Sequence, residues 1–210
     1  MSNLIPTVRA LVNRSPQRRI SFGVAIVCLA LCAIATLPPA SPIPGSGPGV
    51  AWARSGCGHT GGSPANLSLK YMRRGLRRLV NAARSRNGLP ALKSSPKLRR
   101  SANRHSAEMV NGDYFSHDGP GGSSPGARIA RTGYFAGADF YGWGENIAAG
   151  TGKLGSPKAI VRAWMGSSGH RTVILASGFR EMGVGVSRGH PLNGSANSAT
   201  YTLDVGYRSR

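Results

Sequence analysis

Histidine and glutamate are the residue types in this sequence that most readily bind metal ions or move protons. There are few of them, and all lie after residue 57: His59, His105, Glu108, His117, Glu145, His170, Glu181 and His190. No H-E-x-x-H motif occurs, and Cys57, the last cysteine of the chain, has no second cysteine nearby for a zinc finger. Spacing alone therefore leaves the chemistry open.

Three helices are predicted to position these side chains. Apolar residues at helical spacing, with arginines on the other face, predict a first helix over residues 69–83 that Gly88 closes. A second helix is predicted from the cap residue Ser95 to Gly112, and a third opens at Pro157 and continues through Trp164, which is expected to be a core residue.

Two strands are predicted near the end of the chain. Residues 182–187 and 199–207 alternate small or apolar residues with others, and the glycine-rich turn at 189–194 suits an antiparallel pair. Residues 116–124 and 133–155 are interpreted as polar, glycine-rich connections. Helices first and strands last indicate an α+β fold.

The start of the chain has the pattern of an export signal. Four arginines, from Arg9 to Arg19, precede 18 uncharged residues over 20–37 that are mostly apolar. This run suits either a cleaved signal or a membrane anchor, and the small residues Ala51 and Ala53 offer a distant cleavage pattern. We therefore expect the protein to be extracellular or at the cell surface.

These patterns divide the chain into three parts. Residues 1–37 are predicted to be the signal peptide or anchor, 38–66 a disordered Pro/Gly-rich linker, and 67–210 one folded domain. Cys28 and Cys32 lie within the apolar run, so no internal disulfide is expected. Membrane contact is expected only through residues 20–37, if they are not cleaved.

Charge narrows the choice of partners. The chain has 27 Lys and Arg against 7 Asp and Glu, and twelve of the basic residues lie between Lys70 and Arg104 without an acidic one. Such a stripe could bind nucleic acid, but export and the absence of interleaved aromatic residues argue against that partner. Lipid headgroups or anionic envelope components fit an exported protein better, and a merely solvated face is a further alternative.

Four short segments carry a resemblance to a known family. In chain order they are Tyr114-Phe115-Ser116-His117, Gly144-Glu145-Asn146-Ile147, Trp164-Met165-Gly166-Ser167-Ser168-Gly169-His170-Arg171 and Met182-Gly183-Val184-Gly185. Together they resemble the CAP superfamily in its bacterial SCP-like branch, which is related to cysteine-rich secretory proteins, venom allergen 5 and plant pathogenesis-related protein 1. The resemblance covers about residues 76 to 207 and implies a three-layer α-β-α sandwich around a small antiparallel sheet.

The resemblance also implies a site. Family members have a cleft with two histidines and two glutamates, and a divalent metal ion is often bound between the histidines. His117, Glu145 and His170 match three of these positions, while Ser167 stands where the second glutamate is expected. By contrast, His105 is interpreted as a buried, hydrogen-bonded histidine outside the site.

The three matching residues suit a Zn²⁺ ion with one open position, because two neutral imidazoles and a carboxylate are common zinc ligands. In that arrangement His117 and His170 hold the ion, and Glu145 is a ligand, a general base, or a residue that orients a histidine through its other ring nitrogen. The sequence leaves these roles of Glu145 open.

Two functions remain from this reasoning. The favoured one is a binding module for lipid, an envelope component or a partner protein, because family members bind such ligands and the second glutamate is missing. The alternative is a metal-dependent extracellular hydrolase of the peptidase kind, with Glu145 as general base.

Overall fold

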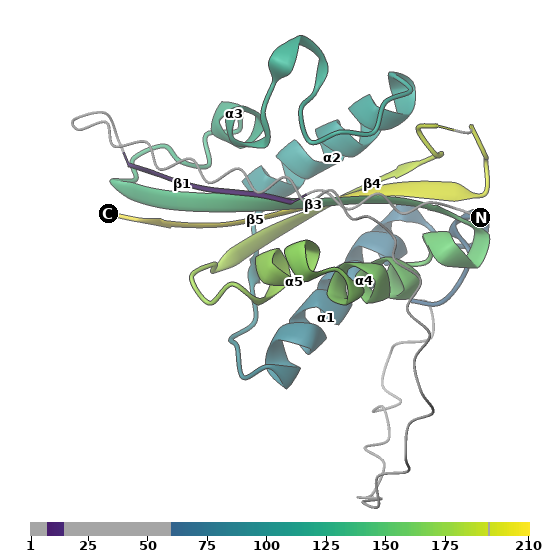
Figure 1. The fold of residues 1–210 in the computed structure, drawn as a ribbon, viewed down its shortest axis with the longest axis horizontal. Helices are drawn as coiled ribbons and strands as arrows, with labels where there is room; N and C mark the ends of the chain where they lie inside the picture. Colours follow the sequence, from purple (N-terminus) through teal and green to yellow (C-terminus); the bar gives the residue numbers. More distant parts are fainter. Residues whose placement is uncertain (1–7, 15–59, 193) are drawn as a thin grey trace, which may run out of the picture.

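The computed structural model describes residues 8–14, 60–192 and 194–210, and a five-stranded sheet forms its centre (Figure 1). The strands are β1 (Val8–Arg14), β2 (Lys93–Ser94), β3 (Phe140–Thr151), β4 (Glu181–Arg188) and β5 (Ser198–Ser209). Their order across the sheet is β1-β3-β5-β4-β2. All neighbours are antiparallel except β2, which pairs in parallel with β4 at two positions only.

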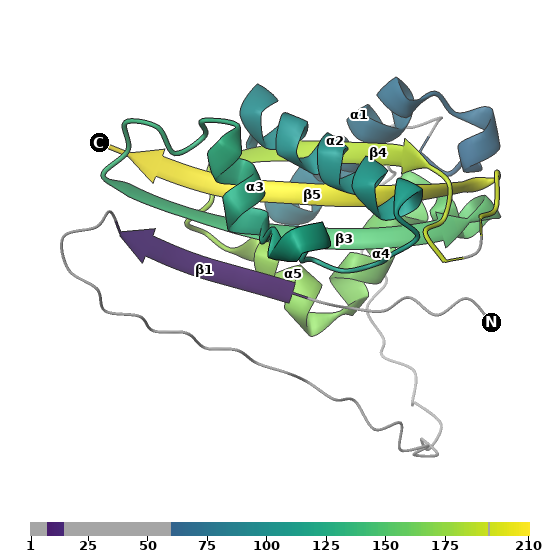
Figure 2. The ribbon, with the colours of Figure 1, turned by 90° about the horizontal axis from the view of Figure 1, so that it is seen from above.

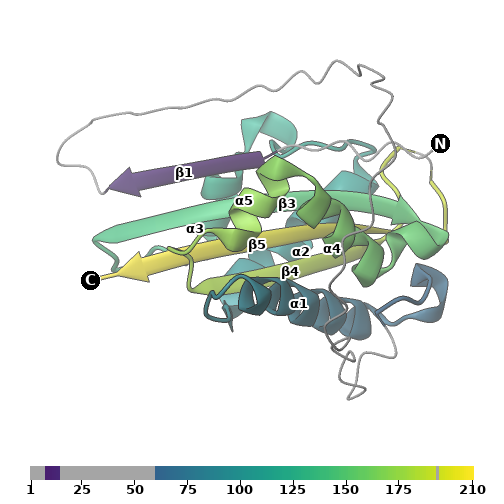
Figure 3. The ribbon, with the colours of Figure 1, turned by 60° about the horizontal axis from the view of Figure 1, so that its bottom comes forward.

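Helices cover both faces of this sheet. One face carries α2 and α3, seen in front of the strands in Figure 2, and the other carries α1, α4 and α5, seen in Figure 3. Their bounds are α1 (Leu69–Arg86), α2 (Pro96–Asn111), α3 (Pro125–Arg131), α4 (Pro157–Gly166) and α5 (Ser168–Leu175), with short 3-10 helices η1 (Pro64–Asn66), η2 (Pro120–Gly122) and η3 (Gly152–Gly155). The predicted three-layer α-β-α sandwich is confirmed.

Serine residues begin four of the helices. The hydroxyl groups of Ser68, Ser95, Ser124 and Ser156 each accept a hydrogen bond from the backbone N–H three residues later, at 3.3–3.4 Å. These bonds satisfy N–H groups that have no partner within the first turn. At the other end of α1, Gly88 adopts a φ of 69°, a left-handed conformation that favours glycine. The three predicted helices are confirmed.

Strand β3 replaces most of the connection predicted over residues 133–155, so that prediction was wrong. Its glycines, which suggested a loop, are places of close contact. A Cβ at Gly142 would overlap the ring of Tyr207, and one at Gly144 would press on Val173 and Phe179. Glycine is therefore needed here for packing across the sheet and not for a turn.

The main core lies between the sheet and the α1, α4 and α5 layer. Trp164 is 1% exposed there, and its indole N–H donates to the carbonyl of Ile147 at 3.1 Å, which confirms the expectation that it is a core residue. A smaller cluster on the opposite face joins Leu98, Ile129, Tyr134 and Trp143. Each helical layer thus has its own apolar contact with the sheet.

The predicted export segment falls mainly outside the described residues. The apolar run 20–37 and all three cysteines belong to that undescribed part, so their predicted roles stay predictions. Val8–Arg14 is described as strand β1, on the outer edge of β3. In the parts that are described, no helix is long and apolar enough to cross a membrane. Thr60 is in contact with the rest of the domain, since its carbonyl accepts from Lys158 N–H at 2.9 Å.

The crossing of α2 over β4 depends on two glycines. A Cβ at Gly183 would overlap the backbone of Leu98 and Arg99, and one at Gly185 would overlap that of Ala102. We expect Gly185→Ala to lower the free energy of unfolding by about 3 kcal/mol or more, because a helix backbone cannot give way as a side chain can. Urea unfolding followed by circular dichroism measures this.

Gly178→Ala is the matched control, because nothing lies within 4 Å of a Cβ at this exposed position. It should change the stability by no more than about 0.5 kcal/mol. Equal effects of the two substitutions would contradict the described contact between α2 and β4.

Candidate functional site

Glu145 lies in the middle of β3 and points to the face of the sheet that carries α2 and α3. Its side chain is fully buried. Trp143, two residues earlier on the same strand, packs on that face too, as the alternation of a strand requires. A carboxylate in such a place is costly unless charged or hydrogen-bonding groups surround it.

Two side chains bind the Glu145 carboxylate. The Nη2 atom of Arg128, in α3, donates to Oε2 at 2.8 Å and to Oε1 at 3.1 Å. The Nδ1 atom of His117 donates to Oε1 at 2.7 Å. Arg128 also donates from Nη1 to the carbonyl of Ser123 at 2.6 Å. The carboxylate therefore ties α3 and the loop that follows α2 to the sheet.

These contacts keep Glu145 ionised. Burial by itself acts to raise the pKa of the carboxyl, but the hydrogen bond from His117 and the positive charge of Arg128 outweigh it and lower the pKa. An anion whose pKa is lowered and whose two oxygens are both engaged is a poor proton acceptor. The geometry thus favours an anchoring role over that of a general base.

His105 completes the surroundings of this carboxylate. It is fully buried in α2, its Nε2 donates to the carbonyl of Ser116 at 3.0 Å, and it lies 3.9 Å from Oε1 of Glu145. Burial lowers the pKa of His105 to about 4, so the ring is neutral at pH 7. The expected buried, hydrogen-bonded histidine is confirmed, but it lies beside the site and not apart from it.

Asp204 brings a second carboxyl group close to Glu145. The two residues are direct partners across β3 and β5, and Asp204 is fully buried. Neither of its carboxyl oxygens has a hydrogen bond of good geometry within the described part, although the side chains of Ser101 and Glu145 lie close enough to influence it. Burial, followed by the negative charge of Glu145, raises the pKa of Asp204 well above its usual value. The pair therefore contains one anion and one group that holds its proton.

His170 lies on the opposite face of the sheet, in α5. The side chain of Asn146, the neighbour of Glu145 in β3, donates to the backbone carbonyl of His170 at 3.0 Å. The imidazole is 4% exposed, its ring centre lies 6.4 Å from that of Trp164, and its two nitrogens have no hydrogen-bond partner within the described part. Adjacent residues of one strand thus hold the two histidine segments from opposite faces.

The outer edge of β3 is the place where the two faces meet. Burial lowers the pKa of His170 to about 4, and electrostatic repulsion from His117 also acts to lower it. Strand β1 runs along this edge, with Arg9 opposite Glu145 and Val8 opposite Asn146 in the ladder. The structure therefore brings His117 and Glu145 into contact and places His170 nearby on the other side of the strand.

This combination of fold and site is matched by a known family. The pattern of the CAP family, described as the cysteine-rich secretory protein family, matches residues 77–202. The chain belongs to the CAP family. The resemblance seen in the sequence is confirmed.

Similar proteins include bacterial members of the CAP family. The chain is 37% identical over 107 residues to the uncharacterised protein YkwD of Bacillus subtilis, which is 51% of this chain and 39% of that protein. It is 30% identical to an extracellular protein containing an SCP domain from Bacillus anthracis, with a TM-score of 0.52, over 66% of this chain and 43% of that one. The matched region thus spans less than half of either relative.

A more distant solved structure has the same fold. An outer surface protein of Borrelia burgdorferi matches with a TM-score of 0.56 and 18% identity, over 68% of this chain and 97% of that chain. At this identity the likeness concerns the fold alone.

Ser167 occupies the junction of two helices in this CAP domain. Its backbone N–H donates to the carbonyl of Trp164 at 3.2 Å, and its carbonyl accepts from Arg171 at 2.9 Å. Its side chain forms no cap bond with α5. The carboxyl group that interacts with Glu145 comes from Asp204 in β5, and not from the helix that bears Trp164.

The side chains fit a zinc site only in part. His170 suits a ligand, because both of its buried ring nitrogens lack a partner among the described residues. Glu145 does not suit one, because Arg128 and His117 already occupy its oxygens. Within the described ranges, no three His, Cys, Asp or Glu residues converge as a metal site would require. Of the roles considered for Glu145, orientation of His117 fits these contacts best.

Arg128 and Asp204 are site residues that sequence reasoning missed. Arg128 is one of 27 basic residues, and its burial at 3% exposure together with its contact to Glu145 distinguishes it only in the structure. Asp204 offered a weak signal, because an acidic residue interrupts the apolar end of the strand predicted over 199–207. Both become visible once strand register and helix placement are known.

Removal of Arg128 tests the anchor. We expect Arg128→Met to lower the free energy of unfolding at pH 7 by about 3 to 5 kcal/mol, because it leaves the buried Glu145 charge without its main partner. Glu145→Gln added to this variant should recover part of the loss, since the unpaired charge is then gone. Chemical denaturation of the wild type, the two single variants and the double variant gives the coupling energy between Arg128 and Glu145.

Arg131→Met is the matched control, since Arg131 is exposed on the same helix. It should cost no more than about 0.5 kcal/mol. If Arg128→Met were equally harmless, the carboxylate would not depend on the arginine.

The raised pKa of Asp204 predicts an unusual pH dependence. The unfolded chain releases this proton at a pH of about 3.9, while the folded chain retains it to a higher pH. Stability is therefore lost as the pH rises through this window. We expect Asp204→Asn, which cannot ionise, to be more stable than the wild type at pH 7 by about 1 to 3 kcal/mol.

Denaturation curves measured at several pH values test this expectation. The difference between the wild type and Asp204→Asn should shrink towards acidic pH, and the same substitution at the exposed Asp139 should show no such trend. A difference that grows on acidification would mean that Asp204 is ionised in the folded protein.

Proposed function

We propose that this chain is an extracellular or cell-surface CAP domain protein that works as a binding module for lipid, an anionic envelope component or a partner protein. The location is supported by the similar Bacillus anthracis protein, which is described as extracellular. It also agrees with the predicted export segment at residues 1–37.

One observation favours binding over catalysis. The carboxylate of Glu145 is fully buried, and both of its oxygens are engaged by Arg128 and His117. A general base must reach the proton that it removes, directly or through one water molecule. Glu145 instead acts as an anchor that holds the 116–124 loop and α3 against the sheet, so that the surface around them keeps one shape.

A divalent metal ion is compatible with this proposal. His117 and His170 would hold it, and Glu145 would orient His117 through Nδ1. Zn²⁺ is the ion that suits imidazole ligands with water in the remaining positions. Its role would be to bind an anionic ligand group or to fix the two histidine segments around the edge of β3.

The alternative of a metal-dependent hydrolase predicts the opposite result in a simple assay. The full chain is tested with added Zn²⁺ on peptide and ester libraries, beside Glu145→Gln and a His117→Ala, His170→Ala double variant. We expect no turnover that depends on these residues. Turnover by the wild type that the double variant loses, and that falls by about 100-fold or more in Glu145→Gln, would establish the hydrolase.

Binding is measured on the same proteins. The probes are vesicles made from bacterial envelope lipids and, separately, purified anionic cell-wall polymer. We expect retention of the wild type on at least one probe, and weaker retention of the His117→Ala, His170→Ala variant when circular dichroism shows that it is folded. Absence of retention on both probes, together with no binding of an envelope protein, would overturn the proposal.

A further inference from the structure

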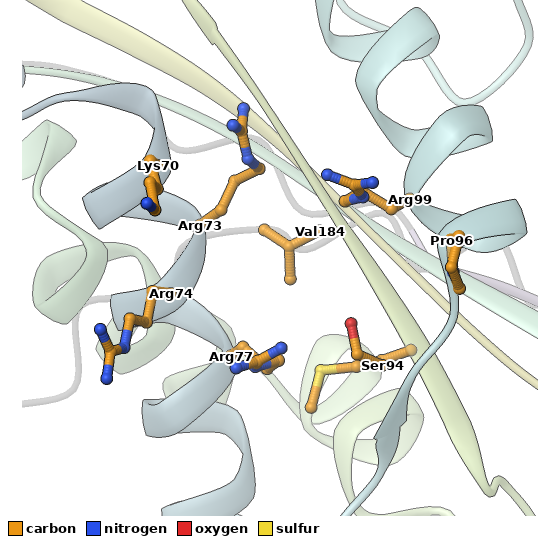
Figure 4. Close-up of a pocket in the computed structure, with 9 residues that line it drawn as sticks. Lys70, Arg73, Arg74, Arg77, Ser94, Pro96, Arg99 and Val184 are labelled. Atoms are coloured by element: carbon orange, nitrogen blue, oxygen red, sulfur yellow. The ribbon is translucent and has the colours of Figure 1, made fainter.

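A basic groove lies beside β4, two strands away from the β3 strand that the histidines adjoin. It is a hollow of about 430 Å³ between α1 and the N-terminal end of α2, beside β4 (Figure 4). Five cationic side chains line it: Lys70, Arg73, Arg74, Arg77 and Arg99. We call it the α1–α2 groove. In the sheet order β1-β3-β5-β4-β2, it adjoins the β4 edge, whereas the histidine site adjoins β3.

The helical pattern gathers these charges on one side of α1. Residues 70, 73, 74 and 77 follow the spacing of a single helix face, and α2 presents Arg99 from across the groove. Like charges four residues apart destabilise a helix by about 0.2 to 0.5 kcal/mol per pair. A solvated helix face would normally intersperse acidic residues, which α1 lacks altogether.

No carboxylate neutralises the groove. All seven acidic residues of the chain lie after residue 107, in the described part, and none forms an ion pair with any of the five cations there. Arg73 and Arg99 are close enough to affect each other: burial, and then the positive charge of Arg99, lower the pKa of Arg73. The folded protein thus holds a cluster of like charges without an internal counterion.

The shape of the groove suits a small ligand. Met182 and Val184 of β4 supply apolar surface between the two helices, and Ser94 and Pro96 border it where β2 ends. A volume of this size is typical of small-molecule sites, which measure about 300 to 1,000 Å³. The first turn of α2 has no acidic residue, so the positive end of its dipole adds to the field of the arginines.

We propose that the α1–α2 groove binds a ligand that carries two or more neighbouring phosphate groups. Guanidinium groups match phosphate oxygens in geometry and form charge-assisted hydrogen bonds with them. Five cations exceed what one phosphate would neutralise. The proposal is independent of the function proposed for the histidine site, because the groove adjoins β4 and the histidine site adjoins β3, with β5 between these two strands.

Inorganic pyrophosphate is the probe, measured by titration calorimetry on the full chain. The wild type should bind it, and an Arg73→Gln, Arg99→Gln double variant should bind about tenfold more weakly or worse. The matched control is Arg100→Gln with Arg104→Gln, which removes two exposed cations of α2 outside the groove. It should bind within about twofold of the wild type, because general attraction by exposed charges is weak and screened.

Thermal unfolding provides a second readout that checks folding as well. Pyrophosphate should raise the melting temperature of the wild type and of the control, but not that of the groove variant. Without the probe, the groove variant should melt at or above the wild-type temperature, because like-charge repulsion has been reduced. Equal weakening of pyrophosphate binding by both double variants, or no binding by the wild type, would overturn the proposal.

Further measurements distinguish a lipid from a soluble source of the phosphate groups, and the groove from the histidine site. Vesicles of phosphatidylcholine with added phosphatidylglycerol test lipid headgroups: retention lost in the groove variant but kept in the control supports a lipid source of the phosphates. Pyrophosphate binding that depends on the groove, without such vesicle binding, supports a soluble source. Failure of the histidine proposal leaves this one intact, because the pyrophosphate experiment compares only variants of the groove and its control with the wild type.

Discussion

The buried carboxylate of Glu145 is the constraint on which the site depends. An ion in the interior of a protein is tolerated only where partners replace the water that it has lost. Here the partners are Arg128 from α3 and His117 from the loop after α2. Since both must reach one point on β3, the positions of a helix and a loop are set by a single charge. The neutral Asp204 beside it is tolerated for the same reason, because a second anion could not be compensated there.

Strand β3 connects the two halves of the site. Its alternation directs Glu145 to the α2 and α3 layer and Asn146 to α5, where the amide holds the backbone of His170. Two histidines that are far apart in the sequence are therefore secured by neighbouring residues of one strand. This arrangement makes the outer edge of β3, along which β1 runs, the chemically distinctive edge of the domain. The region beside β4 has a different chemical character, because the groove there is lined by arginines of α1 and α2 that have no acidic partner in the described part of the chain.

Charge is distributed unevenly along the chain, and this shapes what the domain can do. The acidic residues all follow residue 107, and one of them is engaged by Arg128, while the basic stretch from Lys70 to Arg104 has none. Not every basic residue of that stretch faces solvent. Arg84 is fully buried and donates to the carbonyls of Pro90, Ile174 and Ala176, so it closes the end of α5 against α1. Buried arginines such as Arg84 therefore stabilise the fold, whereas the arginines that line the α1–α2 groove are available to a ligand.

From the amino-acid sequence alone we could predict the helices, the last two strands, the family, and His117, Glu145 and His170 as site residues, because caps, periodicity and short motifs are local signals. The sequence did not reveal β3, whose glycines resemble a loop until Tyr207 and Val173 are seen to need the space. That Arg128 and Asp204 surround Glu145, and that His170 lies on the other face, became visible only from the three-dimensional arrangement. Those relations join residues that are distant in the chain, and they depend on strand register and burial, which no local pattern encodes.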